Sequence, residues 1–147
     1  MILKTLIVIP ARFASTRFLG KPLVEIEGKT MIQRVVEQAR KVPSASKIIV
    51  ATDDERIFQH VENLGFEVKM TRPDHPSGTD RVVEISSQLP DFQLVINLQG
   101  DEPFIQPVQI ERLIQFLKTH DEFEIATLAK QIERPDELEN QIGRAHV

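Results

Sequence analysis

The 147-residue sequence contains no cysteine. Disulfides, zinc–thiolate sites and thiol nucleophiles are therefore excluded. No apolar run approaches the roughly 18 residues that cross a membrane. Residues 1–5 lead straight into a strand-like segment and lack the layout of a signal peptide. These absences predict a soluble cytoplasmic protein that does not act at a membrane.

An excess of positive charge is also missing. The formal net charge is -4 and the isoelectric point is about 5.6, which argues against a general nucleic-acid binder. With 41% hydrophobic and 27% charged residues, the chain can form one folded domain and does not resemble a disordered segment. Its charges are nevertheless uneven, because four cationic residues and no acidic residue precede Glu25. Either a solvated basic face or an anion site would explain this asymmetry.

Short apolar runs alternate with amphipathic helical patterns along the chain. Strands are expected at residues 6–9, 47–52, 66–70, 94–98 and 123–129. Helices are expected around residues 31–39, 57–64, 79–89 and 110–117. Thr30 and the pair Asp53-Asp54 are the expected N-terminal caps of the first two helices, and Gly65 the end of the second.

This alternation predicts an α/β fold, a three-layer α/β/α sandwich with a mainly parallel sheet. In such sheets ligands bind beyond the carboxyl ends of the strands. The segments that follow the three strongest strands are therefore candidate ligand loops. They are residues 10–22, 53–56 and 99–103.

The first of these segments, residues 10–22, is called here the cationic loop. It carries three cations, two hydroxyl groups and no anion, and the cations are Arg12, Arg17 and Lys21. Guanidinium groups match phosphate oxygens in geometry, and lysine adds a point charge, so the loop is a candidate triphosphate site. Gly20 allows a sharp turn beside Lys21. The loop has neither a GxxxxGK[ST] nor a GxGxxG pattern, so a Walker loop and a dinucleotide fold are disfavoured.

Four blocks of sequence follow one another in a characteristic order. They are IPAR, STR and GKPL within residues 9–23, VATDD at 50–54, MTR to SGTDR at 70–81, and NLQGDEP at 97–103. This order resembles the sugar nucleotidyltransferases, and most closely the 3-deoxy-manno-octulosonate cytidylyltransferases, or CMP-Kdo synthetases, of lipopolysaccharide biosynthesis. The resemblance extends to about Asn140. It departs at Phe18-Leu19, where the family usually has leucine and proline, which should affect loop stiffness more than chemistry.

The resemblance implies a Rossmann-like nucleotide-diphospho-sugar transferase fold. It also implies transfer of CMP from CTP to 3-deoxy-D-manno-octulosonate (Kdo), with release of pyrophosphate and with Mg²⁺ as cofactor. The catalytic residues it implies are Arg12, Lys21 and Asp101. The residues it implies for CTP binding are Ala11, Arg12, Arg17, Lys21, Arg72, Ser77, Gly78 and Gln99.

Asp101 is the implied Mg²⁺ ligand. It follows a buried strand, and a carboxylate there can hold Mg²⁺ against triphosphate oxygens. Taken alone, an Asp-Glu pair before a proline is more often a solvated turn, but the cationic loop at the same sheet edge favours the metal site. Glu102 is expected to brace this loop, and Gln99 can both donate to and accept from a cytosine edge.

The loop at residues 71–81 has two expected roles. Ser77 should cap the following helix, and Arg72 with the Ser77-Gly78 backbone should close over the nucleotide. His75 is not expected to be a catalytic base. His60 and His120 are expected at the surface.

Residues 1–141 are interpreted as the nucleotide-binding portion of one incomplete cytidylyltransferase domain. Residues 142–147 resemble the translation of a sequencing adapter and are interpreted as a non-native tail. The resemblance implies that family members continue beyond the region matched here. That further region would supply a second Mg²⁺ ligand, most Kdo contacts and much of a homodimer interface. Two alternatives stay open: another acidic sugar, such as sialic or pseudaminic acid, or a fragment that binds CTP without turnover. The NLQGDEP block favours Kdo, because the sialate enzymes differ there.

Overall fold

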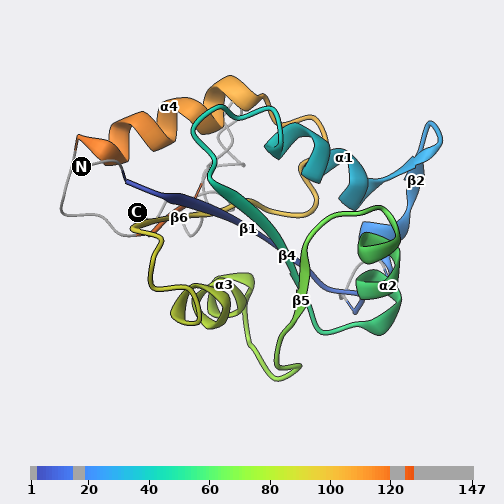
Figure 1. The fold of residues 1–147 in the computed structure, drawn as a ribbon. Coiled ribbons are helices and arrows are strands. Elements are labelled where there is room, and N and C mark those ends of the chain that lie inside the picture. The colour runs from blue at the N-terminus through green and yellow to red at the C-terminus, as the bar shows by residue number, and fades with distance from the viewer. Residues whose placement is uncertain (1–2, 15–18, 120–124, 128–147) are drawn as a thin grey trace, which may run out of the picture.

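A five-stranded parallel sheet forms the centre of the computed structural model (Figure 1), which describes residues 3–14, 19–119 and 125–127. The strand order is β5-β4-β1-β6-β7. The strands are β1 (Thr5–Ala11), β4 (Lys47–Thr52), β5 (Val68–Met70), β6 (Leu94–Asn97) and β7 (Ile125–Thr127). Every pairing in this sheet is parallel, so the carboxyl ends lie along one edge.

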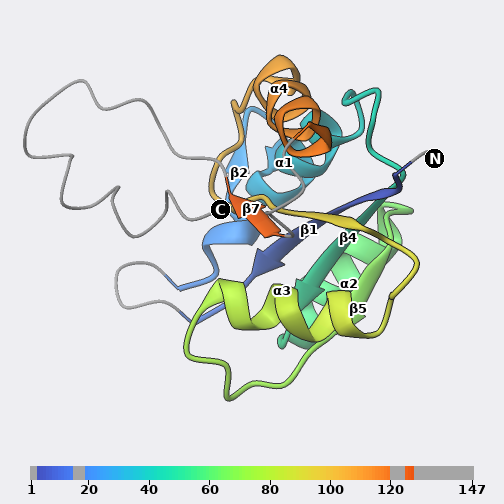
Figure 2. The same ribbon diagram turned by 90° about the vertical axis from the view of Figure 1, so that its left-hand side faces the viewer.

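Helices cover both faces of the sheet, which confirms the three-layer prediction. The helices are α1 (Met31–Ala39), α2 (Glu55–Asn63), α3 (Gly78–Ser87) and α4 (Pro107–Lys118). Figure 2 shows α1 and α4 on one side and α3 on the other. Alternate residues of β1 face opposite layers: Ile7 packs in the cluster with α1, α2 and α4, and Leu6 in the cluster with α3.

The helix starts agree with the caps expected from the sequence. Thr30 Oγ1 accepts the Gln33 N–H at 3.3 Å, and Ser77 Oγ accepts the Asp80 N–H at 3.3 Å. Asp54 accepts two N–H groups at the start of α2, at 2.9 and 3.2 Å. These side chains satisfy N–H groups that have no partner within their own helix.

A short segment between β1 and α1 was not expected from the sequence. It contains a 3-10 turn, η1 (Lys21–Leu23), and the antiparallel hairpin of β2 (Glu25–Ile26) and β3 (Lys29–Thr30). Two-residue strands are too short for a periodic pattern. Their turn is formed by Glu27 and Gly28 with φ of 50° and 85°.

Several other expectations need correction or lie outside the described residues. The expected strand at 66–70 begins two residues later, and α3 begins at Gly78. His60 is half-buried, and its Nε2 lies 2.7 Å from Thr30 Oγ1, because α2 packs beside the start of α1. Arg17, His120 and residues 142–147 lie outside the described residues. None of the helices described is both long and apolar enough to span a membrane.

Candidate functional site

A cavity of about 270 Å³ opens at the carboxyl edge of the sheet, and we call it the strand-end pocket. Residues from three separate sequence blocks line it. Among them are six residues singled out from the sequence: Ala11, Arg12, Lys21, Gly78, Gln99 and Asp101. The fold therefore brings the end of β1, the start of α3 and the loop after β6 to one place.

Two glycines allow this close approach. A Cβ atom added to Gly100 would lie 2.9 Å from the carbonyl oxygen of Pro10, a distance that the backbone could not accept without moving. A Cβ added to Gly78 would lie 3.3 Å from Cγ of Pro10. The loop after β6 and the first turn of α3 thus both pack directly against the end of β1.

A cation and a carboxylate meet at the pocket across 80 residues of sequence. Lys21 Nζ lies 3.4 Å from Asp101 Oδ2, and their side chains are 45% and 41% exposed. An ion pair this exposed contributes at most about 1 kcal/mol to stability. Both groups can therefore exchange this contact for a charged ligand at low cost.

The amide of Gln99 has a defined orientation in the structure. Its Nε2 donates to Asn97 Oδ1 at 3.2 Å, and Asn97 Nδ2 donates in turn to Thr79 Oγ1 at 3.4 Å. The Oε1 atom of Gln99 is directed toward Gly78, 4.0 Å from the position of an added Cβ. This arrangement presents an acceptor oxygen beside the pocket.

Arg72 does not line the strand-end pocket. Its Nε and Nη2 donate to the two oxygens of Asp74 at 3.1 and 2.7 Å, and the side chain is 70% exposed. Ser77, also singled out from the sequence, caps α3 through its hydroxyl and is not among the lining residues. The structure thus places the side chains of Arg72 and Ser77 outside the pocket lining, and their expected nucleotide contacts stay a prediction.

His75 is held by a carboxylate of α3. Its Nε2 lies 2.7 Å from Glu84 Oε1, and the same oxygen accepts the backbone N–H of Arg72 at 3.1 Å. Burial opposes ionisation of Glu84, but the Arg72 N–H and His75 outweigh it and hold the pKa of Glu84 below its usual value. His75 thus joins the loop to α3.

Arg81 is a buried residue near the site that the sequence did not reveal. Its side chain is 1% exposed, and it donates to Thr71 Oγ1 and, at 3.2 Å, to the carbonyl oxygen of Arg72. Asp53 Oδ2 lies 3.6 Å from its Nη2. Burial lowers the pKa of Arg81, Asp53 opposes this change, and the charge of Arg12 adds to it. The available signal was an arginine within the apolar stripe of α3.

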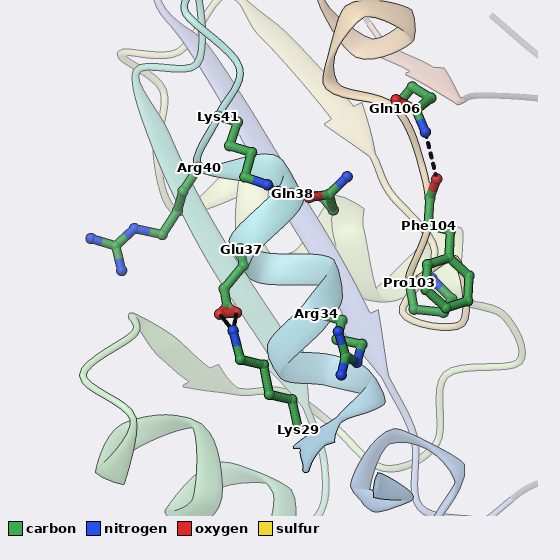
Figure 3. A pocket seen from close by; sticks show the side chains of 9 residues that line it. All are labelled: Lys29, Arg34, Glu37, Gln38, Arg40, Lys41, Pro103, Phe104 and Gln106. Atoms are coloured by element: carbon green, nitrogen blue, oxygen red, sulfur yellow. Dashed lines mark hydrogen bonds and ion pairs between the residues drawn. The ribbon is translucent and has the colours of Figure 1, made fainter. Parts of the chain in front are cut away.

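A larger cavity, of about 510 Å³, runs along α1, and we call it the α1 cavity (Figure 3). Its basic side chains bond mainly to neighbours in sequence. Lys29 pairs with Glu37 at 2.7 Å, Lys41 donates to Gln38 at 2.9 Å, and Arg34 donates to backbone carbonyls. None of the residues predicted to bind CTP or Mg²⁺ lines this cavity.

A family model described as cytidylyltransferase matches residues 6–144. The 3-deoxy-manno-octulosonate cytidylyltransferase of Cytophaga hutchinsonii is 52% identical over 134 residues, which cover 90% of this chain and 53% of that protein. The 8-amino-3,8-dideoxy-manno-octulosonate cytidylyltransferase of Shewanella amazonensis is 50% identical over 137 residues, covering 91% and 56%.

A solved structure of CMP:2-keto-3-deoxy-manno-octonic acid synthetase complexed with CTP is also similar. It matches with a TM-score of 0.78 and 48% identity, over 80% of this chain and 48% of that chain. The chain spans about half the length of the curated relatives it matches.

Proposed function

The chain belongs to the cytidylyltransferase family, and on this basis we propose that the whole protein transfers CMP from CTP to Kdo and releases pyrophosphate. The described residues would form the CTP half of its active site. The strand-end pocket carries this proposal, because it gathers Arg12, Lys21, Gln99 and Asp101 from distant parts of the chain. The similarity to relatives with this activity supports it further.

Positioning and charge stabilisation supply the proposed catalysis. The anomeric hydroxyl of the sugar acid attacks the α-phosphorus, and pyrophosphate leaves in line with it. Arg12 and Lys21, together with Arg17 from outside the described residues, hold the phosphates and stabilise the charge that develops on the leaving group. Gln99 Oε1 accepts a hydrogen bond from the cytosine amino group.

The residues at the pocket fit a magnesium ion shared with the substrate. Asp101 presents an exposed carboxylate at the pocket, and the part of the chain that the structure describes contains no cluster of three His, Cys, Asp or Glu side chains that could hold a metal ion. Mg²⁺ commonly binds through one or two carboxylates, water and substrate phosphates. Asp101 would be its ligand here, and the ion would neutralise charge on the triphosphate.

The role of Asp101 can be tested against its neighbour. Asp101→Asn should abolish the Mg²⁺ dependence of CTP binding, measured by calorimetry with and without the ion. Glu102→Gln, which removes the adjacent carboxylate, should retain that dependence. A Mg²⁺ dependence that survives in Asp101→Asn would contradict the assignment.

The sugar is the part of the proposal with a second candidate. Relatives at 52% and 50% identity act, by their names, on Kdo and on its 8-amino analogue, so the similarity does not separate these two sugars. Pyrophosphate release from CTP should be measured with Kdo, the 8-amino analogue and sialic acid. We expect turnover with Kdo in the full-length protein and none in this chain alone. Turnover with sialic acid alone, or with none of the sugars, would overturn the proposal.

We further propose that the full-length protein is a cytoplasmic homodimer. The resemblance to CMP-Kdo synthetases supports this proposal. Light scattering coupled to gel filtration should give twice the mass of one full-length chain, and a monomer mass would contradict the dimer.

A further inference from the structure

Phe13 and Gly20 meet at the base of the cationic loop, and we call this pair the loop base. The Gly20 N–H donates to the carbonyl oxygen of Phe13 at 2.7 Å. Gly20 has φ of 70°, and a Cβ added there would lie 2.8 Å from Cε2 of the Phe13 ring. The ring therefore packs directly on the glycine, and residues on the two sides of the loop touch.

Arg56, in the first turn of α2, contacts the loop base. Its guanidinium carbon lies 3.2 Å from the centre of the Phe13 ring. The same guanidinium donates through Nε and Nη2 to the two oxygens of Asp54, at 3.2 and 2.7 Å. Asp54 is fixed because it caps α2. A continuous series of contacts thus joins α2 to the loop base.

The neighbours of the loop base give this contact its significance. Arg12 directly precedes Phe13, Lys21 directly follows Gly20, and both of these cations line the strand-end pocket. Neither Arg56 nor Phe13 lines that pocket. Any movement of the loop base would therefore displace both cations at once, although Arg56 itself does not border the pocket.

We propose that Arg56 is a positioning residue, which holds Phe13 and Gly20 together so that Arg12 and Lys21 face the same phosphate groups. The proposal rests on the proposed function of the strand-end pocket. It requires the flat guanidinium, which stacks on the ring while its N–H groups bond to Asp54. The segment after β4, a candidate ligand loop by its position, would thus act on a pocket whose lining it does not join.

Amide hydrogen exchange at Gly20 tests the contact without any nucleotide. We expect exchange of the Gly20 N–H to accelerate about fivefold or more in Arg56→Ala and in Arg56→Lys, because both variants lose the guanidinium group that lies over the Phe13 ring. Phe13→Leu should have the same effect, and Phe13→Tyr should retain the wild-type rate because the ring remains. Arg40→Ala is the matched control, since Arg40 lies 5.3 Å from the centre of the Phe66 ring, away from the pocket.

CTP affinity, measured by calorimetry on the same variants, completes the test. It should fall about fivefold wherever Gly20 exchange accelerates, and stay unchanged in Phe13→Tyr and Arg40→Ala. Weaker CTP binding with unchanged Gly20 exchange would mean that Arg56 contacts the nucleotide, which overturns the proposal. Faster exchange with unchanged affinity would overturn it as well. If the wild-type chain bound no CTP, the proposed function would fail, and Gly20 exchange would still decide whether Arg56 holds the loop base.

Discussion

The α1 cavity and the strand-end pocket differ in a way that size and charge do not capture. The α1 cavity is almost twice as large and has four basic residues in its lining, against two in the strand-end pocket. Its Lys29 and Lys41, however, pair within eight and three residues of sequence. In the strand-end pocket, Lys21 pairs with Asp101 from 80 residues away. The α1 cavity also joins distant segments, since Gln38 Nε2 donates to the carbonyl oxygen of Ile105 across 67 residues. What distinguishes the strand-end pocket is its position beyond the carboxyl ends of parallel strands, where such sheets bind ligands.

The largest expected difference between the two regions concerns two arginines that bond to backbone carbonyls. Arg81 is buried and belongs to α3, whose first residue, Gly78, lines the strand-end pocket, whereas Arg34 lines the α1 cavity and is half-buried. Arg81→Ala should lower the free energy of unfolding by about 3 kcal/mol, because it leaves Asp53 and polar groups of the 71–72 segment without their buried partner.

Arg34→Ala is the matched variant and should cost about 1 kcal/mol, since water can reach the carbonyl oxygens that it leaves. Urea unfolding of both variants measures the difference, provided that the free energy of unfolding depends on urea concentration with the same slope in each. Equal losses would contradict the special position of Arg81.

An intermediate effect, on CTP affinity, is expected when a lysine of the strand-end pocket is removed and is compared with removal of a lysine from the α1 cavity. Lys21→Ala should weaken CTP binding about tenfold in the presence of Mg²⁺, because it removes a charged donor to phosphate. Lys41→Ala removes the same charge from the α1 cavity and should leave the affinity unchanged. Isothermal titration calorimetry gives both dissociation constants. A similar loss of affinity in the two variants would mean that the net charge of the protein, not the position of Lys21, determines CTP binding.

The smallest effect is expected from Asp54, which accepts hydrogen bonds from Arg56 beside the loop base. Arg56 and the N–H groups at the start of α2, against the opposing effect of burial, hold the pKa of Asp54 below its usual range. A lowered folded-state pKa stabilises the protein above about pH 4 and loses that contribution as the pH falls through the folded value.

Asp54→Asn keeps a capping side chain and should cost less than about 1 kcal/mol at neutral pH. Its stability should also fall less steeply than that of the wild type below about pH 4. Urea unfolding between pH 3 and 7 tests this. The double variant Asp54→Asn with Arg56→Ala should show the same pH dependence of the free energy of unfolding as Asp54→Asn alone. Parallel curves for Asp54→Asn and the wild type would refute the role of the pair.

Much of the fold could be predicted because its determinants are local. All seven residues of β1 are buried, so the strand appears in the sequence as a continuous apolar run. Thr30, Asp54 and Ser77 bond to N–H groups two or three residues away, so their capping roles also follow from sequence. The position of the pocket follows from the general rule for parallel sheets.

The remaining features depend on contacts between distant segments. The apolar stripe of α3 hints that Arg81 is buried, but its partners Asp53 and Thr71 come from other elements, and no local pattern identifies them. The contact of Arg56 with Phe13 joins two segments that were candidate ligand loops in the sequence, and composition alone does not reveal that they touch. The sequence suggested Arg72 as a nucleotide contact, and no local pattern showed that its Nε and Nη2 would donate to Asp74.

Titration of the isotopically labelled chain with CTP and Mg²⁺, followed by NMR, tests the central claim most directly. We predict saturable shifts with one common dissociation constant for the backbone amides of Ala11, Gly78 and Gly100. The amides of Gln38, Lys41 and Phe104, around the α1 cavity, should not move. Saturable shifts confined to the α1 cavity would contradict the assignment of the strand-end pocket as the CTP site.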